Sequence, residues 1–234
     1  MVIPTFNSPE VLMNMLTSLH YNTDWEGRVI VVNNGEPLPQ MNVGGSIEIF
    51  QPGKNLGWMG GVNHGLWHAE TEFFCMSNDD LVFPVNLQFW QHLRTNMYDS
   101  FTYTHNGGVA PTSNYVSGCQ NILFHTKSLM VEAPYLIGML AMYRTKTLKD
   151  LKGLDESLPG GDDLDLSIRV KDLGQRLICV RSCYVHHIGS QTGRREAPQY
   201  WDSREHQVAT TNALIKKHGM KKWADCWMGV PKPL

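Results

Sequence analysis

The sequence predicts an α/β domain built on a mostly parallel sheet with helices on both faces. Short β-branched apolar runs alternate with segments that carry apolar residues at helical spacing, which is typical of such a sheet. Of the 234 residues, 42% are hydrophobic and 18% are charged, which is ordinary for a globular chain and excludes disorder. No repeat or low-complexity linker interrupts the chain, so we expect residues 1–234 to form a single domain.

The alternation is clearest in the first half of the chain. We expect strands at residues 2–6, 28–32, 46–50 and 72–77, and helices at residues 10–20 and 61–70. Polar residues stand at or directly after the ends of three of these strands: Thr5, then Asn33 and Asn34, then Asn78, Asp79 and Asp80. Ligands of open α/β sheets bind outside the carboxyl ends of the strands. These polar residues are therefore predicted to converge on one crevice.

The second half is less regular. Residues 101–134 are expected to carry irregular or mixed strands, which form a small mixed or antiparallel element, and residues 139–151 are expected to be helical. A helix is predicted at residues 162–173, with acidic residues in its first turn and Gly174 at its end, followed by a strand at residues 176–185. Residues 194–234 hold eight Lys or Arg against four Asp or Glu, which predicts a basic C-terminal helical extension.

Charge and composition exclude several classes of protein. The formal net charge of −2 gives no field that would draw the protein onto nucleic acid. The longest nearly uninterrupted apolar run, residues 135–143, is too short to cross a bilayer, and no signal-peptide pattern follows Met1. The five cysteines are odd in number and lack a Cys-x-x-Cys pair, so we expect reduced, mostly buried thiols. A soluble, cytoplasmic protein is the expectation.

Two segments suggest chemistry at the expected crevice. Residues 55–65 are rich in glycine and enter a helix, whose free N–H groups favour phosphate. The strand-end triplet Asn78, Asp79 and Asp80 could hold Mg²⁺ or Mn²⁺, since these ions are commonly shared between one or two carboxylates and substrate phosphates. Taken alone, the triplet would be explained better by an ordinary β-turn.

The order of the motifs resembles the family-2 glycosyltransferases, and most closely their rhamnosyltransferase-like branch. The likeness spans nearly the whole chain: the opening Val-Ile-Pro-Thr-Phe-Asn, Val-Val-Asn-Asn-Gly at 31–35, the glycine segment at 55–65 and the Asn-Asp-Asp triplet. Later come Gly-Leu-Asp-Glu at 153–156, the acidic run at 162–169 and the histidines at 186–187. The resemblance implies a GT-A fold with a Rossmann-like sheet, and inverting transfer from a nucleotide sugar.

The resemblance also implies a role for individual residues. Asp80, together with His186 or His187, would hold Mn²⁺ or Mg²⁺, and Asp163 would be the general base beside Asp162. Adjacent residues on an extended segment point oppositely, so only one histidine should reach the metal, with a slight preference for His186. The nucleotide sugar would be bound by Pro4, Thr5, Asn7, Asn33, Asn34, Asn55, Gly57, Trp58, Gly61, Asn63, Asn78 and Asp79.

Two positions depart from the pattern of the family. Most relatives carry Asp where this chain has Asn33, which changes the hydrogen bonds offered to the base; a uridine or thymidine diphosphate donor, UDP or dTDP, is still favoured. Asp162 stands where Glu is usual, so its side chain is shorter by one methylene.

Other residues have structural explanations. Asp165 and Arg169 are spaced for an i,i+4 ion pair, and His64 and His68 lack a third ligand for zinc. Trp58 could line the sugar pocket or pack in the core, and these two interpretations are held equal.

The sequence therefore predicts a metal-dependent inverting glycosyltransferase. It would move a hexose, deoxyhexose or N-acetylhexosamine from a nucleoside diphosphate to a hydroxyl of a glycan, lipid-linked or protein-linked acceptor. The alternative is a nucleotide-sugar-binding module that has lost catalysis. The basic tail would close the active site, while weak contact with a membrane surface is a second possibility.

Overall fold

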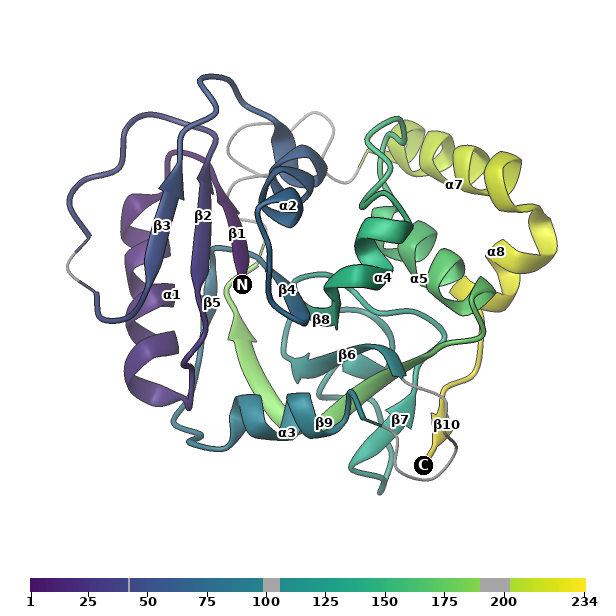
Figure 1. The fold of residues 1–234 in the computed structure, drawn as a ribbon. Coiled ribbons are helices and arrows are strands. Elements are labelled where there is room, and N and C mark those ends of the chain that lie inside the picture. Colours follow the sequence, from purple (N-terminus) through teal and green to yellow (C-terminus); the bar gives the residue numbers. More distant parts are fainter. Residues whose placement is uncertain (42, 99–105, 190–202) are drawn as a thin grey trace.

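The structure of the chain is a computed structural model, shown in Figure 1, and it describes all residues except 42, 99–105 and 190–202. The predictions made for residues 101–105 and 194–202 lie outside this described part. None of the helices in the described ranges has the length and apolar character needed to cross a membrane.

The N-terminal half of the sheet is parallel. Its strands are β1 (Val2–Thr5), β2 (Val29–Asn33), β3 (Ile47–Phe50) and β4 (Phe73–Ser77), in the spatial order β3-β2-β1-β4. Every residue of β1 and β2 is buried, which explains why these strands are continuous apolar runs. All four strands agree with the prediction to within two residues.

The rest of the sheet is mixed. It continues from β4 through β8, β6, β9 and β7 to β10, and only the β6–β9 pair in this part is parallel. The bounds of these strands are β6 (Asn106–Ser113), β7 (Met130–Glu132), β8 (Leu140–Arg144), β9 (Arg176–His187) and β10 (Lys232–Pro233). A further short strand, β5 (Leu81–Val82), pairs with the end of β9.

Helices cover both faces of the sheet, as predicted. Side chains of α1 (Pro9–Asn22) and α3 (Phe89–Thr95) share one buried cluster. Those of α2 (Gly57–Trp67), α4 (Thr145–Asp150) and α5 (Asp162–Asp172) belong to a second cluster on the other face. The tail contributes α7 (Arg204–His218) and α8 (Met220–Trp227), which pack on α5 at the edge of the molecule (Figure 1). A 3₁₀ turn, η1 (Gly118–Gln120), completes the described elements.

Two predicted elements are corrected by the structure. Residues 139–151 are not one helix, because β8 occupies the apolar part and α4 only the polar end. All but the last residue of β8 are buried between β4 and β6, and a continuous apolar run of this length does not distinguish a buried strand from a buried helix. Helix α2 begins at Gly57, four residues before the predicted start, and α3 had not been predicted.

Gly61 explains why α2 tolerates so many glycines. A Cβ atom placed there would lie 2.8 Å from Cβ of Pro4, so the absent side chain lets α2 approach β1. This contact brings the first turn of α2 to the carboxyl end of the central strand.

The five cysteines are all free and buried, as expected for reduced thiols that serve packing.

Candidate active site

A cavity of about 1060 Å³ opens at the carboxyl ends of β1 and β4 and beside the first turns of α2 and α5. It is the place where the sequence predicts a crevice. Twelve of the predicted site residues line it: Pro4, Thr5, Asn34, Asn55, Gly57, Trp58, Asn78, Asp79, Asp80, Asp162, Asp163 and His187. Asp80 and Asp163, which are far apart in the sequence, thus face one hollow.

Asp79 and Asp80 point into the cavity with different partners. The hydroxyl of Thr5 donates to Asp79 Oδ2 over 2.6 Å. Asp80 Oδ2 accepts from the main-chain N–H of Gly189 at 3.0 Å, while Oδ1 lies 3.0 Å from His187 Nε2. Asp80 Oδ1 is buried and, apart from this contact with His187, has no hydrogen-bond partner within the described part of the chain. A buried carboxylate oxygen in this condition is suited to a cation.

The pairing of β5 with β9 brings His187 to Asp80. Leu81 is in register with His187, so the residue that follows Asp80 lies directly across from the histidine. Asn114 holds this histidine by its main chain, since its Oδ1 accepts from His187 N at 2.8 Å and its Nδ2 donates to His187 O at 3.0 Å. The main chain of His187 is therefore fixed beside Asp80.

His187, and not His186, is the histidine that faces the cavity. His186 is exposed and lies 3.3 Å from the hydroxyl of Tyr184, so the preference for His186 is corrected. The expectation that only one of the two would point inward is confirmed. In the tautomer that donates from Nδ1 to the carbonyl of Tyr115, 2.8 Å away, Nε2 carries a lone pair that can accept from Asn78 Nδ2 at 3.1 Å.

The charge state of His187 depends on its neighbours. Burial alone would lower the pKa of His187, but hydrogen bonding to Asp80 and Tyr115 and the nearby negative charge outweigh burial and raise it. The carboxylates of Asp80 and Asp79 thus favour the imidazolium form of His187.

Asp162 and Asp163 begin α5, which follows Gly161. Asp163 Oδ1 accepts from the main-chain N–H of Gly138 at 2.7 Å, and Asp162 Oδ2 accepts from the indole N–H of Trp58 at 3.0 Å. Trp58 thus links α2 to α5 at the wall of the cavity. Its half-buried ring also packs against the core, so Trp58 both lines the cavity and contributes to packing.

Both carboxyl groups are harder to ionise than usual. Burial, and then the charge of Asp162, raise the pKa of Asp163 well above its ordinary value, against the opposing hydrogen bond from Gly138. Burial also raises the pKa of Asp162, although Trp58 opposes this effect. A carboxylate with a raised pKa at the wall of a cavity is a suitable general base.

The other five predicted residues do not line the cavity. Asn7, Gly61 and His186 lie outside it, and the remaining two are held by neighbouring loops. Asn33 Nδ2 donates to Gln51 Oε1 at 2.7 Å. The side chain of Asn63, in α2, is hydrogen-bonded to both the main-chain N–H and the carbonyl of Leu154. The glycine segment thus places its last asparagine in a structural position.

Two further expectations about charged residues can be compared with the structure. Asp165 and Arg169 form the predicted i,i+4 ion pair, at 2.7 Å. His64 and His68 lie on the surface of α2 against Phe50, and His68 Nδ1 is 2.9 Å from the carbonyl of His64.

Ten residues that line the cavity were not predicted, and half of them come from residues 101–134, where irregular or mixed strands had been expected. They are Phe6, Asn114, Tyr115, Val116, Ser117, Asn121, Ile137, Gly138, Met139 and Pro159. Gly138 contributes only a main-chain N–H, and Asn114 acts through the main chain of His187, so neither produces a spacing signal in the sequence.

The donor set fits a divalent cation held jointly with a ligand. Among the described residues, no group of three or more His, Cys, Asp or Glu converges on one point. The pair formed by Asp80 Oδ1 and His187 Nε2 supplies two ligand atoms, and cations such as Mg²⁺ usually complete their shell with water and substrate phosphates. The residues thus suit a metal that arrives with a phosphorylated substrate.

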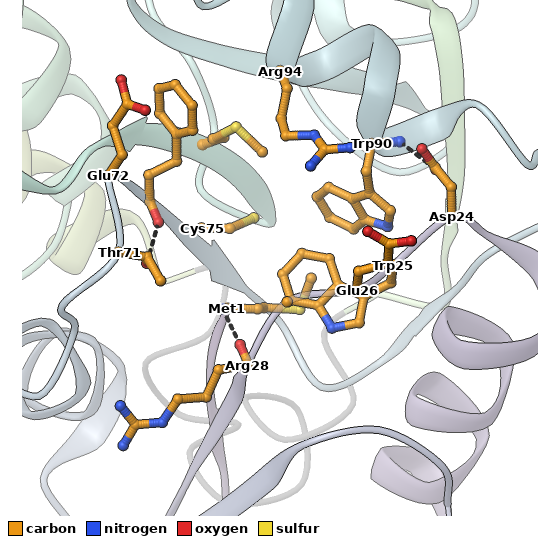
Figure 2. Close-up of a pocket in the computed structure, with 13 residues that line it drawn as sticks. Met1, Asp24, Trp25, Glu26, Arg28, Thr71, Glu72, Cys75, Trp90 and Arg94 are labelled. Atoms are coloured by element: carbon orange, nitrogen blue, oxygen red, sulfur yellow. Dashed lines mark hydrogen bonds between the residues drawn. The ribbon is translucent and has the colours of Figure 1, made fainter.

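A second cavity, of about 170 Å³, lies at the opposite end of the sheet (Figure 2). Met1, Arg28 and Phe73, which line it, stand at or before the amino ends of β1, β2 and β4. Because parallel α/β sheets bind ligands at their carboxyl ends, the large cavity is the functional candidate.

Comparison with known proteins identifies the class. The family described as Glycosyl transferase family 2 matches residues 1–152, and the chain therefore belongs to this family of glycosyltransferases. No match was found among curated protein sequences.

Solved structures confirm the predicted GT-A fold. A mannosyltransferase from Pyrobaculum calidifontis, in complex with GDP-Man and Mn²⁺, has a TM-score of 0.65 at 14% identity, over 96% of this chain and 68% of its own. GalNAc-T7 with UDP, GalNAc and Mn²⁺ has a TM-score of 0.67 at 14% identity, over 96% and 49%. S. aureus TarS 1–349 with UDP-GlcNAc has a TM-score of 0.64 at 17% identity, over 96% and 70%. The chain thus spans about half of GalNAc-T7 and somewhat over two thirds of the other two.

Proposed function

We propose that the protein is a metal-dependent, inverting glycosyltransferase that moves a sugar from a nucleoside diphosphate to a hydroxyl acceptor. The observation that carries this proposal is the convergence of Asp80 and Asp163 on one cavity, where His187 is the one partner of Asp80 Oδ1 among the described residues. One carboxylate is suited to a cation and the other to a proton. The rhamnosyltransferase-like branch, with a hexose, deoxyhexose or N-acetylhexosamine as donor sugar, remains part of the proposal.

The donor would lie along the carboxyl ends of β1 and β4. Thr5 and Asn34 would border the base and ribose, and Asn78 the ribose. A nucleotide sugar is supported by the volume of the cavity and by GDP-Man, UDP and UDP-GlcNAc in the similar structures. UDP or dTDP remains the favoured donor nucleotide, and GDP is included in the test because the mannosyltransferase binds it.

Asp80 and His187 would hold the metal, Mn²⁺ or Mg²⁺. When bound, this ion neutralises charge that builds on the diphosphate leaving group. Asp79, which accepts from Thr5, would keep the end of β1 close to that site.

Asp163 would act as the general base. The N–H of Gly138 fixes one carboxylate oxygen, which leaves Oδ2 to take the proton of the acceptor hydroxyl as that oxygen attacks C1 of the sugar. Asp162, oriented by Trp58, would contact the acceptor beside it. The acceptor would be a glycan, lipid-linked or protein-linked hydroxyl, as in polysaccharide biosynthesis.

A single displacement, and hence inversion, is supported by the arrangement of the carboxylates. A retaining route through a covalent intermediate needs a nucleophile on the opposite face of the sugar. Among the described lining residues, Asp79 is bonded to Thr5 and Asp162 to Trp58, while Asp80 faces His187. Asp163 is thus the carboxylate best placed to accept a proton.

As the pH is lowered, we expect transfer to be lost at a higher pH than an ordinary carboxyl group would give. Asp163 must be ionised to accept a proton, and its pKa is raised, so activity should be lost as the pH falls through that raised value. The midpoint of the acid limb of the kcat/KM profile, which reports the free enzyme, should lie above about 4, the ordinary value for a carboxyl group. A midpoint at or below that value would contradict the assignment of the base.

Thermal denaturation with candidate donors tests the function itself. Each of UDP, dTDP and GDP, and their sugars, is added with and without Mn²⁺, because a ligand that binds only the folded state raises Tm. We expect one nucleotide to raise Tm only when Mn²⁺ is present, and its sugar to be transferred with an inverted anomeric centre in the product, as measured by NMR. Binding without hydrolysis or transfer to any acceptor would instead favour the inactive binding module.

A further inference from the structure

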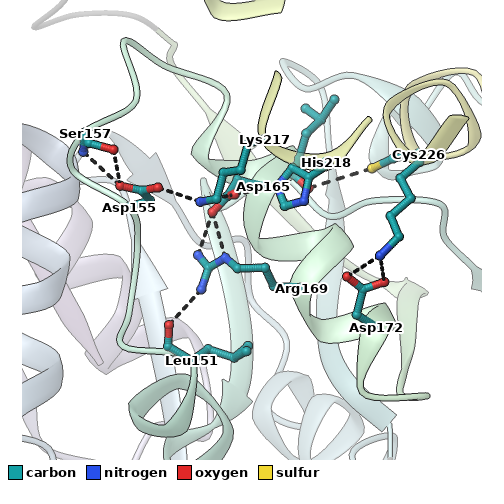
Figure 3. Close-up of polar contacts among 11 residues, drawn as sticks. Leu151, Asp155, Ser157, Asp165, Arg169, Asp172, Lys217, His218 and Cys226 are labelled. Carbon is teal, nitrogen blue, oxygen red and sulfur yellow. Dashed lines mark hydrogen bonds and ion pairs between the residues drawn. The ribbon is translucent and has the colours of Figure 1, made fainter. Parts of the chain in front are cut away.

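Asp165 is a buried charge that the proposed chemistry does not use. Its side chain is fully buried in α5, two residues after the proposed base. Oδ2 pairs with Arg169 at 2.7 Å, whereas Oδ1 lies 2.6 Å from Lys217 Nζ and 2.7 Å from His218 Nε2. Figure 3 shows these side chains gathered around the one carboxylate.

The last turn of α7 supplies two of these partners. Lys217 also reaches Asp155 Oδ2, at 2.5 Å, so its ammonium group bridges α5 and the loop that precedes it. Farther along, Lys222 of α8 pairs with Asp172 at 2.7 Å. The C-terminal helices therefore contact α5 at both of its ends.

Helix α7 also touches the entrance of α5. Gly161, the residue before Asp162, has φ +74°, and a Cβ atom there would lie 2.7 Å from Leu214 Cδ1. Leu214 is buried in one cluster with Leu158 and Leu164. Helix α7 thus packs against the left-handed turn at Gly161, which precedes Asp162 and Asp163 at the cavity.

The charges in this network favour one position of α5 relative to α7. Burial would raise the pKa of Asp165, but hydrogen bonds from Lys217 and His218 and the charge of Arg169 outweigh burial and lower it. A buried carboxylate kept in its ionised form must keep its cationic partners close, because separating them exposes an uncompensated charge. Displacement of α5 relative to α7 is therefore opposed.

We propose that Lys217 and His218 are positioning residues, which hold Asp163 at its working distance from the acceptor hydroxyl by fixing Asp165. This inference rests on the proposed function, since it concerns the same base. The two aspartates share the first turn of α5, so a shift at one is carried to the other. A misplacement of about 1 Å can lower the rate roughly 100-fold.

The main test compares three lysine variants of the full chain. Lys217→Met removes the ammonium group but keeps most of the stem, Lys217→Arg keeps a cation, and Lys221→Met is the control on exposed α8. We expect Lys217→Met to lower kcat by about 10-fold or more, with KM for the donor within about twofold of wild type. Lys217→Arg should restore most of kcat, and the control should match wild type.

The control is closely matched. Like Lys217, which pairs with Asp155, Lys221 forms an ion pair with an aspartate, in this case Asp225 of the same helix. The side chain of Lys221, however, is 88% exposed. Equal kcat for Lys217→Met and Lys221→Met would overturn the inference. A parallel loss of kcat, donor affinity and Tm without rescue by arginine would also overturn it, because the role would then be structural. If Lys217→Met does not fold, His218→Gln replaces it in the same comparison.

A second readout does not depend on transfer. Trp58 donates to Asp162, so the ¹⁹F signal of 5-fluorotryptophan at position 58, assigned with Trp58→Phe, reports where the start of α5 lies. We expect this signal to shift in Lys217→Met and to stay unchanged in Lys221→Met. If the wild-type protein transfers no sugar, the proposed function fails, whereas the fluorine signal still decides the positioning: an unchanged signal in Lys217→Met would overturn it.

Discussion

Asp163→Asn is expected to lower kcat for sugar transfer by about 100- to 10,000-fold, which is the contribution of a positioned general base. Asn keeps an oxygen that can accept from the N–H of Gly138, so the geometry at the start of α5 should be retained. The donor nucleotide should therefore still bind with Mn²⁺, as measured by calorimetry. Undiminished transfer by the variant would refute the role of Asp163.

The same substitution should make the protein more stable. The pKa of Asp163 is raised in the folded state, so the stability that its protonated form provides at low pH is lost as the pH rises from the unfolded value to the folded one. A neutral Asn avoids this loss at pH 7, and Tm should rise, since 1 kcal/mol corresponds to about 2–4 °C in a domain of this size. Asp150→Asn is the control and should leave kcat unchanged, because Asp150 is exposed at the end of α4 and pairs with Lys146 of the same helix.

Asp80→Asn is expected to remove the dependence of nucleotide binding on Mn²⁺. The variant keeps an oxygen for the N–H of Gly189 but loses the negative charge beside His187. Affinity for the nucleoside diphosphate in the presence of Mn²⁺ should fall by roughly 100-fold or more. Mutation of residues that only hydrogen-bond a metal ligand already lowers metal affinity about 10- to 100-fold, and loss of a ligand itself should cost at least as much. Isothermal titration with and without Mn²⁺ measures this difference.

Asp225→Asn is the control for this prediction, because Asp225 is 61% exposed on α8 and pairs only with Lys221 in the described ion pairs. It should bind the nucleotide and Mn²⁺ as wild type does. Retention of full Mn²⁺-dependent affinity by Asp80→Asn would exclude Asp80 as the metal ligand.

The sequence predicted the parallel half of the sheet well, for a physical reason. Strands β1 and β2 are buried on both faces, so they are short continuous apolar runs that end in polar residues at the cavity. Burial on both faces also explains the wrong prediction at β8, where a continuous apolar run was expected to be helical. Periodicity cannot distinguish the two when every residue is buried.

The site was predictable where a residue follows a strand or begins a helix, as Asp80 and Asp163 do. It was not predictable where pairing between distant strands decides which side chain points inward. The register of β5 with β9 selects His187 over His186, and no local pattern reports that register. Asn63 illustrates the converse, because a motif position can be used to bind a loop, here through Leu154.

A crystal structure with UDP and Mn²⁺ is the most direct test of the claim that one donor site lies between Asp80 and Asp163. The anomalous signal of manganese should fall beside Asp80 Oδ1 and His187 Nε2, with the diphosphate bound to the ion and its open end directed toward Asp163. Manganese and nucleotide bound elsewhere, with this cavity left empty, would contradict it.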